Sequence, residues 1–242
     1  MNKTNKWSGI FTFTTFLLAG CGGGGGGGGG GNSEPVVSTQ SFNVKTAMAT
    51  YDSMPHSYRF SGSGTFGGAA VTITGTGATS ALSSATFEGQ TVLQQTQTTN
   101  LTLTDSNGSR PLDGVLTLFY LPADYTPLGS ISSTNRYEVT DLPVTFPTSA
   151  KVGDRGFIRT TKYYADGTKT TQTGDSETGY LIEADTATSV VVKFVSRQNY
   201  SLPSAVTQIE TVRYRLDSIG ALTLLADSIE VGNDKLIVEP IR

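Results

Sequence analysis

The sequence predicts an all-β fold, an antiparallel meandering sheet with one helix near the N-terminal end of the folded part. Threonine, valine, serine, tyrosine and phenylalanine are plentiful, and charged residues make up 15% of the chain, below the roughly 25% of an ordinary soluble domain. Short alternating runs of polar and apolar residues follow one another with turn residues between them. Because no helical segments intervene, consecutive strands pair antiparallel rather than through crossover helices. Such a sheet closes into a barrel, packs as a sandwich or curls into a half-barrel, and these alternatives stay open.

The single predicted helix covers about residues 43–54. Its apolar residues follow the spacing i, i+3, i+4, i+7, which places them on one helical face: Val44, Ala47, Met48 and Tyr51. Ser41 or Asn43 is placed to cap the N-terminus, and Pro55 ends the helix because it lacks a backbone donor. We expect this helix to pack across one end or the mouth of the sheet.

From Ser57 onward the chain reads as short strands whose side chains alternate between two faces. In the clearest strand, residues 210–216, apolar residues alternate with polar ones: Val212, Tyr214 and Leu216 against Thr211, Arg213 and Arg215. A second strand alternates in the same way: Val190, Val192 and Phe194 against Val191, Lys193 and Val195. Strands are also predicted at 91–104 and 114–121.

Four dipeptides mark predicted turns. Asn107-Gly108 and Asp113-Gly114 lie between two of the predicted strands, and Gly232-Asn233 separates the last two. Asp166-Gly167 predicts a hairpin, because type I′ turns need positive φ at both central residues.

Residues 41–242 are predicted to form the all-β domain. A faint internal similarity relates its halves, at about 57–146 and 147–242, since both run through a Gly-containing turn, a Thr-rich strand and a final Gly-x-Leu-Thr-Leu-type strand. Thr-rich β sequences also align by composition alone. A duplicated domain and a single sheet with a long loop around Pro143–Pro147 are therefore both open.

The first twenty-one residues have the organisation of a signal peptide. Lys3 and Lys6 form a short basic region, and residues 7–18 form an apolar stretch that is too short to span a hydrocarbon core of ~30 Å as a helix. Small residues follow at Ala19 and Gly20, directly before Cys21. The segment Leu18-Ala19-Gly20-Cys21 resembles the lipobox of bacterial lipoproteins, which the type II signal peptidase reads.

This resemblance implies that residues 1–20 are removed, that cleavage falls between Gly20 and Cys21, and that Cys21 carries acyl chains such as palmitate. In Gram-negative members of the class an Asp after the cysteine favours retention in the inner membrane. Gly22 stands there instead, which implies the outer membrane, on its periplasmic face or at the cell surface. The unbroken glycine run 22–31 predicts a disordered tether over residues 21–40.

Charge and cysteine content exclude several function classes. The net charge is −3, and removing residues 1–20 takes away Lys3 and Lys6 and no acid, which leaves about −5. No basic stripe remains to neutralise phosphates, which argues against nucleic acid as a partner. Because Cys21 is the only cysteine and belongs to the anchor, the domain has no disulfide, thiolate nucleophile or cysteine metal site.

Two apparent active-site motifs have ordinary explanations. Residues Gly62–Gly67 match G-x-G-x-x-G, but a strand follows where dinucleotide binding needs a helix N-terminus. His56 is the only histidine, so no histidine metal cluster forms. Asp52 lies four residues before it, but Pro55 separates the two, and we interpret His56 as a boundary residue at the end of the helix.

The carboxylates give no catalytic or metal-binding motif either. A pair for glycoside hydrolysis is spatial, and the acids in this chain mostly stand where turns are expected: Asp105, Asp113, Asp166, Asp175 and Asp234. Three further acids are candidates for calcium without forming its loop motif: Asp141, Asp154 and Asp185. Of the adjacent Tyr163 and Tyr164, one is expected in the core and the other outside. No catalytic, cofactor-binding or metal-binding residue is assigned.

The sequence thus predicts a non-enzymatic, lipid-anchored β domain of the bacterial envelope. It would bind an apolar ligand or an envelope protein partner, or serve in envelope structure or assembly. A curled sheet with a helix across it resembles, in architecture, the half-barrel carriers of the lipoprotein-sorting system. The alternatives are an envelope hydrolase of the glycosidase or Ser/Lys type and a surface adhesin-like module.

Overall fold

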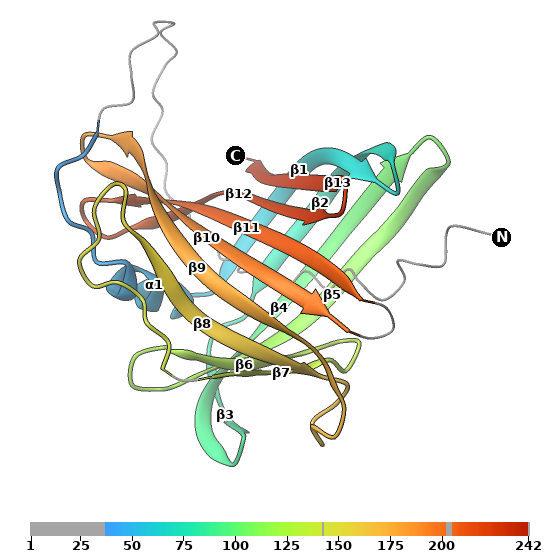
Figure 1. Cartoon of the computed structure of the whole chain (residues 1–242), viewed down its shortest axis with the longest axis horizontal. Coiled ribbons are helices and arrows are strands. Elements are labelled where there is room, and N and C mark those ends of the chain that lie inside the picture. The colour runs from blue at the N-terminus through green and yellow to red at the C-terminus, as the bar shows by residue number, and fades with distance from the viewer. Residues whose placement is uncertain (1–36, 142, 202–204, 242) are drawn as a thin grey trace, which may run out of the picture.

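The described residues form an antiparallel β-barrel with one short helix (Figure 1). The structure, a computed structural model, describes residues 37–141, 143–201 and 205–241. Its elements follow in chain order: α1 (Val44–Asp52), β1 (His56–Phe66), β2 (Ala69–Thr79), β3 (Ser83–Phe87), β4 (Gln90–Asp105), β5 (Gly108–Tyr120), β6 (Pro127–Ser132), β7 (Tyr137–Thr140), β8 (Arg155–Tyr164), β9 (Gln172–Thr186), β10 (Ser189–Tyr200), β11 (Val206–Asp217), β12 (Leu222–Val231) and β13 (Asp234–Ile241).

The sheet closes on itself at two places. Strand β1 pairs on one side with β2 and on the other with β13, so the first and last strands are neighbours. The second half of β4 pairs with β2 in the register Thr72↔Thr104, while its first half pairs with β3 in the register Ser83↔Gln94. Of the strands in the described ranges, twelve therefore form the ring, and β3 extends beside β4 outside it. The barrel, rather than the sandwich or half-barrel, is the alternative that this protein adopts.

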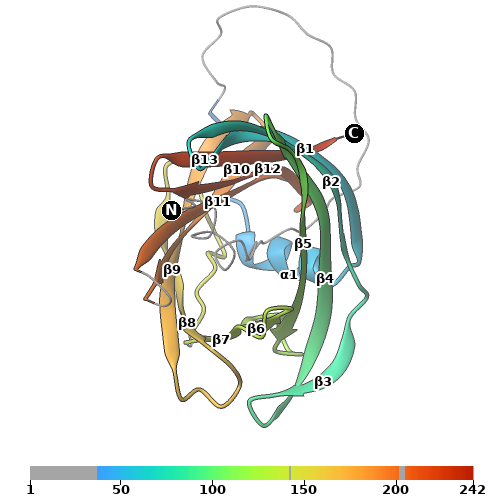
Figure 2. The same cartoon turned by 90° about the vertical axis from the view of Figure 1, so that its right-hand side faces the viewer.

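The predicted helix is confirmed. Its N-cap is Asn43, whose side chain accepts a hydrogen bond from the backbone N–H of Thr46. The apolar face is buried as expected, and Figure 2 shows α1 within the ring of strands, where it joins the main core. Within the described ranges, no helix is both long enough and apolar enough to cross a membrane.

The main hydrophobic core lies inside the barrel around α1. Alternate residues of the strands point inward, as in β2, where Val71 and Ile73 are buried while Thr72 and Thr74 are exposed. The predicted inward faces of β10 and β11 are confirmed, and both belong to this core. A second, smaller cluster packs β3 against its neighbours: Phe87, Val92, Phe119 and Leu128.

Two predicted turns need correction. Asp113-Gly114 is not a turn but lies within β5, where Asp113 and Gly114 pair with β4. Asp166-Gly167 lies in a hairpin between β8 and β9 as expected, but the loop is longer than two residues, and the positive φ falls on Lys169 instead. Asn107-Gly108 and Gly232-Asn233 do connect paired strands. An Asp-Gly dipeptide can thus lie within a strand when both of its residues pair with a neighbouring strand.

The two candidate repeats contribute β1–β7 and β8–β13 to one continuous sheet. Their common origin stays a prediction. The lipobox, the anchor at Cys21 and the polyglycine run lie outside the described residues.

Candidate functional site

Part of the barrel interior is lined by polar rather than apolar side chains. These residues come from the strands between β4 and β12 and are all buried: Gln95, Gln97, Thr99, Ser130, Ser132, Glu138, Thr140, Thr161, Ser176, Thr178, Gln198, Gln208, Glu210 and Asp227. Buried glutamate, aspartate and glutamine are costly unless they are paired or bound. Their concentration inside one barrel therefore makes this interior the candidate functional site.

Arg136 and Glu138 form the best-connected charge pair of this site. The Nε of Arg136 donates to Glu138 Oε1 at 2.8 Å, and the exposed fractions of the two side chains are only 10% and 5%. The second carboxyl oxygen of Glu138 accepts from the Ser130 hydroxyl at 2.6 Å. Burial alone would lower the pKa of Arg136, but Glu138, Tyr200 and Tyr163 raise it above its ordinary value. Arg136 is therefore a permanent cation inside the barrel.

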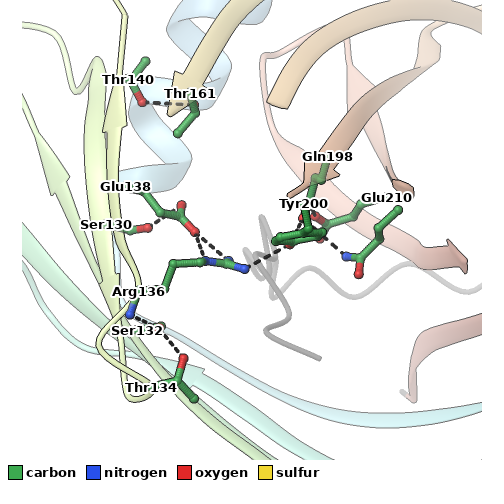
Figure 3. A network of polar contacts seen from close by, with 11 residues as sticks. Ser130, Ser132, Thr134, Arg136, Glu138, Thr140, Thr161, Gln198, Tyr200 and Glu210 are labelled. Atoms are coloured by element: carbon green, nitrogen blue, oxygen red, sulfur yellow. Dashed lines mark hydrogen bonds and ion pairs between the residues drawn. The ribbon is translucent and has the colours of Figure 1, made fainter. Parts of the chain in front are cut away.

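Arg136 also crosses the barrel interior to strand β10 (Figure 3). Its Nη1 donates to the hydroxyl of Tyr200 at 2.9 Å, although 64 residues separate the two in the chain. The guanidinium lies 4.9 Å from the ring centroid of Tyr163 and 5.6 Å from that of Tyr200, and the two rings stack with centroids 5.6 Å apart. Cation–π contacts of this kind hold a guanidinium in a desolvated place.

The network continues from Tyr200 to strand β11. The Tyr200 hydroxyl donates to Gln198 Oε1, and the amide nitrogen of Gln198 donates to Glu210 Oε2 at 2.8 Å. The amide nitrogen of Gln208 reaches Gln198 Oε1 at 3.4 Å. A continuous polar chain thus runs from Ser130 on β6 to Glu210 on β11, and Figure 3 shows its members from both walls facing one another.

Seven buried side-chain oxygens of the described residues have no hydrogen-bond partner. They belong to six residues in two groups: Gln208, Glu210 and Asp227 on β11 and β12, and Asp52, Gln95 and Gln97 on α1 and β4. Such atoms are rare in folded proteins, because each one forfeits the hydrogen bonds it would make in water. Water or a ligand with donor groups is needed to satisfy them.

Burial keeps protons on the unpartnered carboxyls. It raises the pKa of Asp52 to about 8 against the opposing charge of Arg159. It raises the pKa of Asp227 to about 7, and the backbone N–H of Ser228 lowers this pKa by a smaller amount. Neither carboxyl oxygen of Asp227 has the geometry of a hydrogen bond with a partner. The pKa of Glu210 is also raised, first by burial and then by the charges of Asp227 and Glu138. A neighbouring carboxylate adds to burial because two like charges disfavour each other's ionisation.

His56 is a boundary residue, as predicted. Its Nε2 lies 2.8 Å from the backbone oxygen of Tyr51, and its ring stacks on the Tyr51 ring with centroids 4.7 Å apart. Partial burial lowers the pKa of His56 to about 4, so the ring is neutral at physiological pH. Asp52 is buried, and its Oδ1 has no hydrogen-bond partner.

The other candidates also have structural roles. Asp105 and Asp166 accept backbone N–H bonds two residues ahead, as turn aspartates do, and Asp234 accepts from Gly67 and Gly68. Gly62 and Gly64 of the G-x-G-x-x-G match lie within β1. The part of the chain that the structure describes holds no cluster of three or more acidic, histidine or cysteine residues suited to a metal. Tyr163 is buried and Tyr164 partly exposed, in line with their alternation.

Sequence analysis missed the residues of the polar network, although their signal was present. In β11 the apolar alternation of Val212 and Tyr214 extends back through Glu210 to Gln208, which share the inward face. In β10 the inward face likewise extends to Gln198 and Tyr200. Charged and amide residues that continue the inward side of a strand pattern mark a polar interior. What the pattern does not reveal is which strands face each other.

Comparison of the chain with protein-family models, with curated proteins and with solved structures finds no match. The function of the barrel is therefore inferred from its own residues.

Proposed function

We propose that this protein is a lipoprotein of the bacterial outer membrane, held through acyl chains on Cys21, whose barrel is a non-enzymatic domain that binds a small polar ligand in its interior. The observation that carries the binding role is the set of seven buried, unpartnered oxygens inside the barrel. The anchor rests on the lipobox Leu18–Cys21 and on the glycine run that follows it. Two acyl chains are enough for stable attachment to a bilayer.

The barrel dimensions support an internal ligand. Eight strands enclose an interior that side chains fill or that holds one small ligand, and the interior widens with strand number. With twelve strands, this barrel has a wider interior. The helix α1 and the apolar core occupy one part of the interior, which is lined by β1, β2 and β13 together with the apolar residues of β4, β10, β11 and β12. The polar part keeps unused acceptors, so a polar ligand suits it better than the apolar ligand that the sequence suggested.

Binding is favoured over hydrolysis by burial of the acids. A glycosidase needs two carboxyl groups that a bulky glycoside reaches from solvent. Glu210 and Asp227 are neighbours with raised pKa values, but only 2% and 1% of their surfaces are exposed. This burial suits a small ligand that the barrel encloses.

The anchor is tested by fractionating cells of a Gram-negative host. We expect Cys21→Ser to leave the membrane fraction and to lose the mass of its acyl chains, because no other cysteine is present to accept them. Gly22→Asp should move the protein from the outer to the inner membrane, whereas the matched Gly22→Ser should not. Unchanged membrane attachment of Cys21→Ser would refute the anchor.

The binding role is tested by native mass spectrometry of the full chain carrying Cys21→Ser, purified from the periplasm. We expect a small polar molecule to be retained, and Gln97→Leu and Gln208→Leu to lose it because each removes an unpartnered acceptor. Gln90→Leu, an exposed position at the start of β4, serves as the control. Retention of a fatty acid instead would favour an apolar-ligand carrier. An empty barrel that no polar compound stabilises would contradict the proposal.

A further inference from the structure

On β11 and β12, the buried side-chain atoms that have no hydrogen-bond partner are all oxygens. When the two acids are ionised, these oxygens are all acceptors: Oε1 of Gln208, Oε1 of Glu210, and Oδ1 and Oδ2 of Asp227. Each of these residues is at most 2% exposed. A partner of the ionised acids must therefore donate hydrogen bonds or carry positive charge, because a buried acceptor is satisfied in no other way.

Strand pairing places the two acids together. Glu210 is opposite Ile229 and Asp227 is opposite Val212, so the acids are diagonal neighbours on one face of adjacent strands. Diagonal neighbours lie about 7–8 Å apart along the backbone, within reach of each other's side chains. Gln208 lies on the same face of β11, and its amide reaches Gln198, which donates to Glu210. The oxygen atoms thus come from two strands and gather beside one carboxyl pair.

Glu210 and Asp227 have no ion-pair partner among the described residues. Arg136, which lowers the pKa of Glu210, is engaged by Glu138. Arg136, which precedes β7, and Glu138 on β7 act on the charge of Glu210, and Glu210 acts on Tyr200 of β10. Both acids of the pair act on Tyr214 of β11. Arg159 of β8 interacts with Glu138 and with Asp52 of α1. Arg136 and Arg159 are the cations of this set, and Arg136 is the one that lowers the pKa of Glu210.

We propose that Glu210 and Asp227, with the amide oxygen of Gln208, bind a small cation inside the barrel. This inference rests on the proposed ligand-binding function and names the charge of the ligand. The ligand that fits these residues carries a compact positive charge, which carboxyl and amide oxygens can contact directly. A metal ion such as Ca²⁺ and a primary ammonium group, which has three donors, both provide it.

Binding is linked to proton release. A carboxyl that burial keeps protonated near neutral pH must lose its proton before it holds a cation, because a cation binds the carboxylate form. When a cation enters, the O–H bond of a carboxyl breaks, the proton leaves to solvent, and the carboxylate oxygen contacts the cation. Affinity therefore rises as the pH rises through this range.

The test is isothermal titration of the full chain carrying Cys21→Ser, at pH 5.5 and pH 8.0, with separate arms for CaCl₂, KCl and ethylammonium chloride. We expect one cation per barrel and an affinity on the order of tenfold or more higher at pH 8.0. Buffers of different ionisation enthalpy should report about one proton released at pH 5.5 for each positive charge of the bound cation. The arms identify whether a metal ion or an ammonium group is preferred.

Variants locate the site. Asp227→Asn and Glu210→Gln keep the shape of each side chain and should remove both the binding heat at pH 8.0 and the cation-induced rise in melting temperature. Asp113→Asn, an exposed acid on β5, should leave both unchanged. The folded state of the variants is checked by their melting in cation-free buffer, where Asp227→Asn should melt no lower than the parent because it removes an unpaired buried carboxyl.

The outcomes separate this inference from the proposed function. Cation binding that survives in Asp227→Asn, or that fails in every arm, overturns the cation site. If a neutral polyol stabilises the barrel while the cations do not, the ligand-binding function stands and the charge assignment is wrong. If neither cations nor neutral polar compounds bind, both are wrong.

Discussion

Arg136 illustrates how much one side chain holds together inside this barrel. It pairs with Glu138, donates to Tyr200 and lies against two tyrosine rings, and these contacts connect the turn before β7 with β8 and β10. Removing one member of a buried ion pair leaves the other charge unpaired, and that penalty exceeds the net gain of the intact pair. The contribution of Arg136 is therefore measured by comparing single and double variants.

We expect Arg136→Met to lower the free energy of unfolding by about 3 kcal/mol or more, because Glu138 stays buried without its cation. Adding Glu138→Gln should recover part of this loss. The control is Arg213→Met, whose ion pair with Glu183 lies on the exposed outer face, and it should cost less than about 1 kcal/mol. Urea unfolding measures all three. Equal costs for Arg136→Met and Arg213→Met would show that the internal pair is unimportant.

The buried acids also give a pH dependence at the residue scale. The pKa of Asp52 is raised to about 8 and that of Asp227 to about 7, both by burial, so the folded state holds protons that the unfolded state has lost. Stability therefore falls as the pH rises from about 4, where the unfolded carboxyls ionise, to about 7 for Asp227 and about 8 for Asp52, by at most about 1.4 kcal/mol per pH unit for each group. Thermal melting across this range should show the fall. Asp52→Asn and Asp227→Asn should each reduce its slope, and a flat profile in the parent protein would contradict the pKa assignments.

At the scale of elements, α1 is what fills the apolar part of the barrel. A nine-residue helix is too short to be stable alone, so its stability comes from the side chains it buries against the surrounding strands. Met48 is 1% exposed and belongs to the main core, while Thr50 on the opposite face is exposed. The helix and the barrel therefore stabilise each other.

Met48→Ala should lower the free energy of unfolding by about 2–5 kcal/mol, because it leaves a cavity where the helix meets the core. Thr50→Ala on the exposed face should change it by less than about 0.5 kcal/mol. Chemical denaturation measures both values. Should the two variants unfold alike, α1 would not be part of the cooperative barrel.

For the whole molecule, the decisive event is closure between β1 and β13. These strands come from opposite ends of the domain and approach closely where β1 has glycines. A Cβ atom at Gly64 would lie 1.9 Å from the backbone oxygen of Lys235, and one at Gly62 would lie 2.2 Å from that of Ile237. Side chains at these positions would push the two closing strands apart. The non-local pairing also predicts slow folding, on the order of milliseconds to seconds.

Gly64→Ala should therefore destabilise the protein by about 1–3 kcal/mol, through strain at the junction of the barrel. Ser61→Ala, at an outward-facing position of the same strand, is the matched control and should have little effect. Hydrogen exchange should show faster opening of β1 and β13 in Gly64→Ala than in the control. Protection unchanged along both strands would mean that the glycine is not needed for closure.

The sequence by itself determined the local features of this protein. Some features depend only on residues that are close in the sequence, so they can be predicted without knowing the fold. They are the alternation in 210–216, the helical spacing from Val44 to Tyr51 and the Gly232-Asn233 turn. Only the tertiary structure decided that the sheet closes as a barrel. It also decided that Arg136 meets Tyr200 across the interior and that Glu210 lies beside Asp227. Closure depends on how twist and register accumulate around twelve strands, and no short segment encodes that sum.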